Sequence, residues 1–253
     1  MNILLVNDDG IASGALRVLC RALASRGHRV TVCAPAGQQS AKSHCFTINT
    51  PVQVAERHDV EGATAAWAID GTPADCTRIG LMDLCEGPVD LVISGINYGY
   101  NAGLAVYVSG TVGAAREAAF QRKPSLALSM HYDTTEEALR FFAEWSVTVA
   151  ERLVGYDRRP ELSVCNINMP GCAVHEVQTP VMCPLSRNVY NDSYERRVSP
   201  RGQIYYWLHP ETPDDRPTPG SDVDLLNKNH ITCTFLGPEP LEQTQYADFL
   251  EEL

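Results

Sequence analysis

The sequence lacks the motifs of several large classes of phosphate- and nucleotide-binding proteins. It contains no G-x-x-x-x-G-K-[ST] segment, which excludes a P-loop NTPase. Gly95, Gly99 and Gly103 are spaced by four residues, which is not the G-x-G-x-x-G dinucleotide fingerprint. A haloacid-dehalogenase-type phosphatase needs an Asp two residues before its second Asp, but Asn7 stands two residues before Asp9. These three classes are therefore excluded.

Basic residues are also few, and the sequence shows no zinc motif and no signal-peptide pattern. There are 20 Lys and Arg against 31 Asp and Glu, a net charge of -11, which argues against a nucleic-acid or membrane-surface binder. Ten of the acidic residues, but only two basic ones, lie within residues 206–253. The nine cysteines form no Cys-x-x-Cys pair and no Cys/His set with zinc spacing, so we expect reduced thiols. With no basic segment before the short first apolar run, we expect a cytoplasmic protein.

The hydrophobic pattern predicts an α/β fold. Apolar runs that indicate buried strands alternate with helical periodicity up to about residue 170, so we expect a Rossmann-like, doubly wound, mostly parallel sheet. Beyond that point, prolines and short β-like runs favour β-rich extended arms. We therefore predict a catalytic core over 1–170 and, over 171–253, an oligomerisation arm with a C-terminal segment that packs on the core. The expected strands are 2–6, 29–34, 46–54, 65–69, 89–94, 125–129, 162–167, 204–208 and 230–235, and the expected helices are 14–24, 72–87, 111–120 and 136–154.

Two adjacent acids follow the first predicted strand. Asp8 and Asp9 come directly before Gly10, and a bend at this glycine would let both carboxylates face one site at the carboxyl edge of the sheet. Adjacent carboxylates repel each other unless a cation or a proton lies between them. Oxygen ligands of this kind favour Mg²⁺ or Mn²⁺. The alternative is a helix N-cap beside an acid without a role.

Neutral oxygen donors follow two other strands at the same expected edge. Ser40 lies in the loop after the second strand, and Asn97 follows the strand at 89–94. Two neutral ligands would leave a divalent ion able to attract a phosphate. Ser109, Gly110 and Thr111 begin a predicted helix, where free N–H groups and the helix dipole favour an anion. The sequence predicts a metal and phosphate site from these residues.

The ordered motifs resemble the survival protein SurE family of metal-dependent nucleotidases. The matching segments are ILLVNDDGI (3–11), APAGQQSAKSH (34–44), DGTPADCTRIGL (70–81), LVISGINYGYNAG (91–103), YVSGTVGAAREAAF (107–120) and NINMP (166–170). The resemblance implies one divalent metal ion per subunit, held by Asp8, Asp9, Ser40 and Asn97. It also implies hydrolysis of nucleoside 5′- and 3′-monophosphates, and homodimers or homotetramers built partly by exchanged C-terminal arms.

The mechanism we expect is attack of a metal-activated water on the phosphoryl group. Asp8, Asp9 and Asn97 are the candidate catalytic residues, and Ser40 joins the 109–111 helix start as a candidate phosphate contact. Either acid could orient the water, and His44 and His230 are the candidate histidines for a proton donor. The sequence leaves two alternatives open: a receiver-like module phosphorylated on Asp70, and a catalytically silent interaction protein on the same fold.

Overall fold

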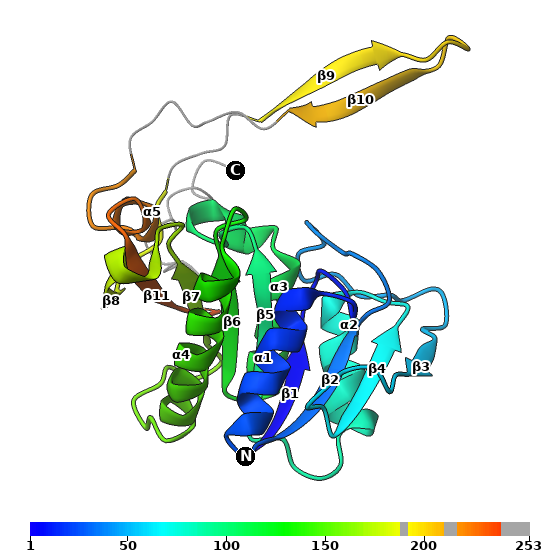
Figure 1. Cartoon of the computed structure of the whole chain (residues 1–253). Coiled ribbons are helices and arrows are strands. Elements are labelled where there is room, and N and C mark those ends of the chain that lie inside the picture. Colours follow the sequence, from blue (N-terminus) through cyan, green and yellow to red (C-terminus); the bar gives the residue numbers. More distant parts are fainter. Residues whose placement is uncertain (188–191, 210–216, 239–253) are drawn as a thin grey trace, which may run out of the picture.

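The computed structural model describes residues 1–187, 192–209 and 217–238, and its centre is one nine-stranded sheet (Figure 1). The strands lie side by side in the order β3-β4-β2-β1-β5-β6-β7-β11-β8. Their bounds are β1 Asn2–Val6, β2 Arg29–Pro35, β3 Val54–Glu56, β4 Ala65–Ile69, β5 Leu91–Tyr98, β6 Ser125–Met130, β7 Val164–Met169, β8 Gln178–Met182 and β11 His230–Leu236. The six central strands from β4 to β7 are parallel, whereas β3 and β11 pair antiparallel to their inner neighbours. The predicted doubly wound, mostly parallel sheet is confirmed.

Helices cover both faces of this sheet and bury apolar side chains against it. On one face α1 (Gly14–Ser25) and α4 (Glu136–Val154) share a hydrophobic core with the central strands. On the other face α2 (Pro73–Ile79), the π-helical turn η1 (Gly80–Leu84) and α3 (Gly110–Phe120) cover β1, β2 and β5. All of these strands except β3, β8 and β11 run in one direction, so their carboxyl ends meet at one edge. That edge carries the candidate site.

Side-chain caps fix where the main helices begin. Ser13, Thr72, Ser109 and Thr135 each accept a hydrogen bond from a backbone N–H in the first turn of the helix that follows. At Thr72 the predicted signal is complete, because the Asp75 carboxylate accepts a hydrogen bond from the Thr72 N–H and closes a capping box. The cap at Ser109 is the one that bears on function, since it places the start of α3 at the edge of the sheet.

The C-terminal part contains an antiparallel hairpin and a return to the sheet. Among the described residues, β9 (Ser193–Val198) and β10 (Ile204–His209) pair only with each other, and they project away from the body in Figure 1, which confirms the predicted β-rich arm. The chain then forms α5 (Asp222–Leu226) and enters the main sheet as β11, between β7 and β8. The sheet of the predicted 1–170 core is thus extended by two later strands. The division at residue 170 stays a prediction.

The strand predicted at 46–54 is wrong for most of its length. Only Val54–Glu56 forms a strand there. The backbone N–H of Thr47 donates to the Asp75 carboxylate at 3.2 Å instead of to a neighbouring strand, and Ile48 is 85 % exposed. The Asp75 carboxylate, which completes the capping box of α2, therefore binds the backbone donor that a strand would need.

No helix within the described residues is long and apolar enough to span a membrane. All nine cysteines lie in the described part of the chain and are free thiols. Two short 3₁₀ turns complete the fold: η2 (Gly103–Tyr107) and η3 (Val174–Glu176). Of these, η2 lies in the connection from β5 to α3, which joins two parts of the candidate site.

Candidate active site

The chain turns sharply after β1, as predicted. Gly10 has a φ of +96°, and the Asn7 side chain brackets it by donating to the Gly10 carbonyl at 3.0 Å and accepting from the Gly10 N–H at 3.1 Å. A side chain on Gly10 would also lie 3.2 Å from the Pro35 carbonyl oxygen. The turn holds Asp8 and Asp9 at the carboxyl edge of the sheet.

Asp8 is buried against the start of α3. Its side chain is 4 % exposed, and its two oxygens accept from the Thr111 hydroxyl at 2.6 Å and the Thr111 N–H at 3.2 Å. Burial raises the pKa of Asp8 to about 6, although the hydrogen bond from Thr111 opposes this shift. A Cβ on Gly110 would come within 3.0 Å of the Asp8 carboxylate, so only glycine permits this close approach.

Asp9 has one oxygen with partners and one without. It accepts a hydrogen bond from the backbone of Tyr98 and another from the Gln38 side chain, while its Oδ2 is buried with no protein partner. Burial raises the pKa of this carboxyl as well. A buried carboxylate oxygen without a partner is costly, which suggests that a cation satisfies it.

The loop after β2 lies over the two acids. The Gln39 N–H donates to the Asp8 carbonyl at 2.7 Å, and the Gln38 amide donates to the Ser40 hydroxyl at 3.1 Å. Because Gln38 also bonds Asp9, it links an acid to the serine. Further on, Ser43 fastens the loop to the segment before α3 through the Val108 carbonyl at 3.0 Å. These contacts hold the loop that carries Ser40 against the turn that carries the two acids.

Asn97 reaches the same edge at the end of β5. Its amide nitrogen donates to the Gly99 carbonyl at 2.8 Å, so Oδ1 is the atom that a cation would contact. The pairing of β5 with β6 is irregular between Ser94 and Asn97. Gly95 makes this irregularity possible, with a φ of +137° and a virtual Cβ only 2.4 Å from the Leu128 carbonyl oxygen.

The chemistry of this donor set fits a hard divalent cation. Asp8, Asp9, Ser40 and Asn97 offer only oxygen atoms, and both carboxyls are held in surroundings that disfavour their charge. Across residues 1–187, 192–209 and 217–238, no group of three or more His, Cys, Asp and Glu side chains forms a metal cluster. A site with two carboxylates and two neutral oxygens is consistent with that finding.

The helix start lies beside the acids, but part of it is already engaged. Ser109 accepts from the Val112 N–H at 3.0 Å, and both donors of Thr111 bind Asp8. The predicted phosphate contact of Ser109, Gly110 and Thr111 therefore stays a prediction. The contact between Thr111 and Asp8 is a role that the sequence did not indicate.

The remaining candidates lie elsewhere in the fold. His44 pairs with the buried Glu117 at 3.0 Å, and His230 contacts the Thr179 carbonyl at 2.9 Å. Asp70 follows β4, which β2 separates from β1. A receiver-like acceptor at Asp70 would need to face the acid pair, so this position argues against that alternative.

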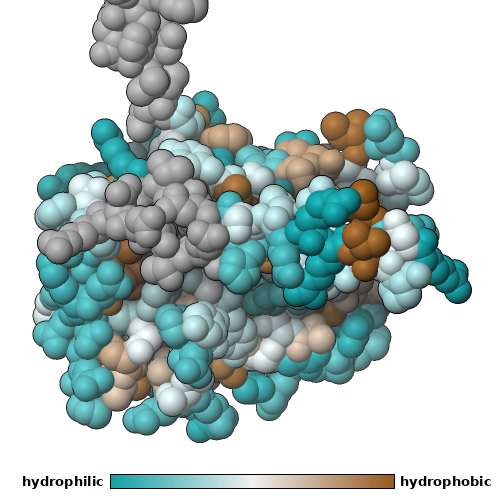
Figure 2. Space-filling view, turned by 90° about the horizontal axis from the view of Figure 1, so that it is seen from above, coloured by the Kyte–Doolittle hydropathy of each residue, from teal (hydrophilic) through white to brown (hydrophobic). Residues whose placement is uncertain are grey.

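Sequence reasoning missed two contributors, Gln38 and Tyr98. The tyrosine contributes a backbone N–H, which no sequence pattern reveals. Gln38 is exposed and follows no periodicity, so its position two residues before Ser40 was the one signal available. Figure 2 looks down on this edge, where hydrophilic residues make up most of the visible surface and hydrophobic residues are scattered among them.

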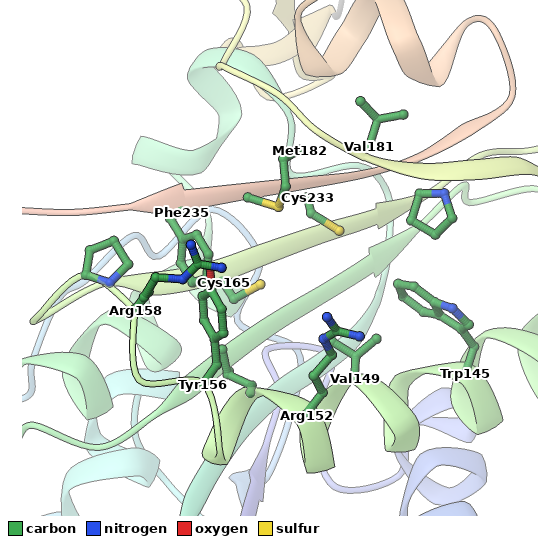
Figure 3. A pocket seen from close by; sticks show the side chains of 13 residues that line it. Trp145, Val149, Arg152, Tyr156, Arg158, Cys165, Val181, Met182, Cys233 and Phe235 are labelled. Atoms are coloured by element: carbon green, nitrogen blue, oxygen red, sulfur yellow. The ribbon is translucent and has the colours of Figure 1, made fainter.

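A cavity of about 680 Å³ lies away from this edge, between the second half of α4 and the strands β7, β11 and β8 (Figure 3). Its walls are mostly apolar, and Trp145, Met182 and Phe235 are among them. Arg152 and Arg158 supply charge, but none of the lining residues is an acid. This cavity contains no residue of the predicted site.

Several known proteins are similar to this chain in sequence or in structure. A protein named 5'-nucleotidase SurE from Desulfovibrio desulfuricans is 42% identical over 240 residues, covering 92% of this chain and 91% of that protein. One of the same name from Solidesulfovibrio magneticus is 40% identical over 255 residues, covering 100% and 98%. The crystal structure of the SurE protein from Aquifex aeolicus superposes with a TM-score of 0.81 at 28% identity, covering 99% and 100% of the two chains. The family described as survival protein SurE matches residues 3–192, and the chain belongs to this family.

Proposed function

We propose that the chain is a divalent-metal-dependent nucleotidase that hydrolyses nucleoside 5′- and 3′-monophosphates to nucleoside and phosphate. The observation that carries the proposal is the buried Asp9 oxygen without a partner, next to Asp8 and at the carboxyl edge of a parallel sheet. The names of the relatives, 5'-nucleotidase SurE, support the choice of substrate class.

Asp8, Asp9, Ser40 and Asn97 would hold one Mg²⁺ or Mn²⁺ ion. When bound, such an ion polarises a phosphoryl oxygen and lowers the pKa of a bound water. The protein's part is to position these ligands. Thr111 fixes both oxygens of Asp8, and Gln38 links Asp9 to Ser40. Ser40 and the helix start at Ser109–Thr111 would bind the remaining phosphate oxygens.

The test is hydrolysis of a panel of nucleoside 5′- and 3′-monophosphates by the purified protein. We expect phosphate release that falls to background in excess chelator and returns with added Mn²⁺ or Mg²⁺. Activity that persists after complete chelation would contradict the metal-dependent mechanism. Release of phosphate from none of the nucleotides would contradict the proposed activity itself.

We also propose a cytoplasmic homodimer or homotetramer that uses the hairpin as an arm and binds no nucleic acid or membrane. The register of β9 and β10 places five apolar side chains on one face, and each is more than half exposed. They are Tyr194, Val198, Ile204, Tyr206 and Leu208. A lone two-stranded hairpin is marginally stable in water, so a second copy of the chain is the partner that would cover this face.

The double substitution Tyr206→Ser with Leu208→Asp is expected to lower the oligomer mass, because it places a charge on the apolar face. Sedimentation at several protein concentrations measures this mass. Tyr205→Ser is the matched control, since Tyr205 lies on the opposite face of the same strand. A wild-type protein that sediments as a monomer at every concentration would refute the assembly.

A further inference from the structure

The connection from β5 to α3, residues 99–109, joins two parts of the candidate site. It begins two residues after Asn97 and ends at Ser109, which caps α3. The 3₁₀ turn η2 is its only regular structure. Contacts from outside the loop must therefore fix its position.

The first of these contacts is a buried amide network at the start of the loop. The Asn101 N–H donates to the Asn168 side chain at 2.9 Å, and the Asn101 carbonyl accepts from the Asn166 amide at 2.8 Å. The Asn101 amide donates to the Ser129 hydroxyl at 2.8 Å. These bonds fasten the start of the loop to β6 and β7.

The second contact comes from Asp222, which is 1 % exposed. Its Oδ2 accepts from the Gly103 N–H at 2.7 Å, at the beginning of η2. Its Oδ1 accepts from the N–H groups of Ser186 at 2.7 Å and Val223 at 2.8 Å. Three backbone N–H groups hold this buried carboxylate, and charge-assisted bonds of this kind are stronger than neutral ones.

Asp222 also joins the two ends of the hairpin stem. Ser186 lies on the segment that leads out toward β9, and Asp222 begins α5 on the segment that returns from β10. The Asp222 N–H donates to the Pro184 carbonyl at 3.0 Å. Gly103 packs directly on this stem, because its virtual Cβ would lie 3.3 Å from the Ser186 carbonyl oxygen. In Figure 1, α5 lies at the edge of the sheet where the strands β5, β6 and β7 end.

We propose that Asp222 is a positioning residue that couples the hairpin stem to the metal and phosphate site through Gly103. It holds the loop of residues 99–109 in the place that presents Asn97 to the cation and Ser109 to the substrate. This inference depends on the proposed function. The β9–β10 hairpin, which we expect to contact a second copy of the chain, is thus connected to the site through the buried Asp222 carboxylate.

The decisive variant is Asp222→Asn, which keeps the size of the side chain. One oxygen becomes an NH₂ group, which cannot accept from the N–H groups of Gly103 or Ser186. We expect the dissociation constant for Mn²⁺, measured by calorimetric titration, to rise about tenfold, as for other residues that orient metal ligands. We expect kcat/KM to fall roughly tenfold to a hundredfold, because small displacements of reacting groups are costly.

Asp224→Asn is the matched control on the same helix. Asp224 contacts Lys228 and the Gly220 N–H at the surface, and it has no bond to the loop. Mn²⁺ affinity and activity should therefore remain at the wild-type level. Gly103→Ala disturbs the same contact between Gly103 and Asp222 from the loop side. If Asp222→Asn does not fold, Gly103→Ala is measured in its place. If both variants act through one contact, their effects on Mn²⁺ affinity will not add.

The outcomes separate this inference from the proposed function. A wild-type protein that needs Mn²⁺ for nucleotide hydrolysis, with an unchanged Mn²⁺ dissociation constant in folded Asp222→Asn or Gly103→Ala, overturns the inference alone. A lower urea midpoint with wild-type Mn²⁺ affinity also overturns it, because that pattern indicates a purely structural role. A wild-type protein without nucleotidase activity contradicts the proposed function instead.

Discussion

Replacing Asp8 by Asn is expected to abolish nucleotide hydrolysis and to make the metal-free protein more stable at pH 8. The loss of activity should reach about 10³-fold, since a metal ion contributes several kcal/mol to catalysis of this kind. The gain in stability has a separate cause. Asp8 is buried beside Asp9, and with no metal bound its ionised form is unfavourable.

The sign of the pH dependence follows from the raised pKa. The pKa of Asp8 rises from 3.8 in the unfolded chain to about 6 in the folded one, so the native state favours the protonated carboxyl. Its contribution to stability is complete below about pH 4 and is lost as the pH rises through about 6, a difference of about 3 kcal/mol. Because Asn does not ionise, the variant does not suffer this loss of stability. It does lose the hydrogen bond from the Thr111 N–H, so its free energy of unfolding should exceed that of the wild type by about 2 kcal/mol at pH 8.

Urea unfolding in excess chelator measures this effect. The free energy of unfolding of Asp8→Asn should exceed that of the wild type at pH 8, and the difference should shrink at pH 5. Asp83→Asn, a substitution at an exposed acid, serves as the control, and its free energy of unfolding should equal that of the wild type at pH 8 and at pH 5. An Asp8→Asn protein that is less stable than the wild type at pH 8 would show that burial does not dominate at this carboxyl.

Replacing Gly95 by Ala is expected to reduce both stability and activity strongly. Its φ of +137° is unfavourable for any L side chain, and the new methyl group would lie 2.4 Å from the Leu128 carbonyl oxygen. Strain and overpacking together should lower the free energy of unfolding by about 2–4 kcal/mol. The strand must also move away from β6, which displaces Asn97 and should lower kcat/KM by about 100-fold.

Gly87→Ala provides a matched comparison. Gly87 also has a positive φ, +79°, but its virtual Cβ meets no atom within 4 Å. It should lose some stability from backbone strain alone and keep wild-type kcat/KM. Chemical denaturation of both variants measures the effect of backbone strain on stability, and steady-state kinetics measures the effect of displacing Asn97 on kcat/KM. A Gly95→Ala protein with the kinetics of Gly87→Ala would mean that β5 tolerates the methyl group without moving Asn97.

The parts of the fold that follow from local chemistry could be predicted from the sequence. The buried strand before Asp8 and the cap at Thr72 depend on neighbouring residues, and both were predicted correctly. The strand predicted at 46–54 failed because Thr47 donates through its N–H and its hydroxyl to Asp75, which is distant in the sequence. The same limit explains why the contact between Thr111 and Asp8 was not predicted, since the two residues lie far apart in the sequence.

The site itself was predicted only as a set of candidates at one edge. Parallel strands bring their carboxyl ends together, so Asp8 and Asn97 could be assigned to that edge from the alternation of strands and helices. The link through Gln38 and the anchor at Asp222 could not be predicted, because both depend on how loops fold back over the strands. Loop contacts between distant residues leave no periodic trace in a sequence.

The position of β11 has a consequence for the order in which the protein matures on the ribosome. β11 lies between β7 and β8, although β8 is synthesised before it and the whole hairpin comes between them. A nascent chain therefore contains every candidate ligand long before β8 has a strand to pair with, and before Asp222 can reach Gly103. The strands that carry the ligands can assemble early, whereas the loop between Asn97 and Ser109 gains its second anchor only near the end of translation.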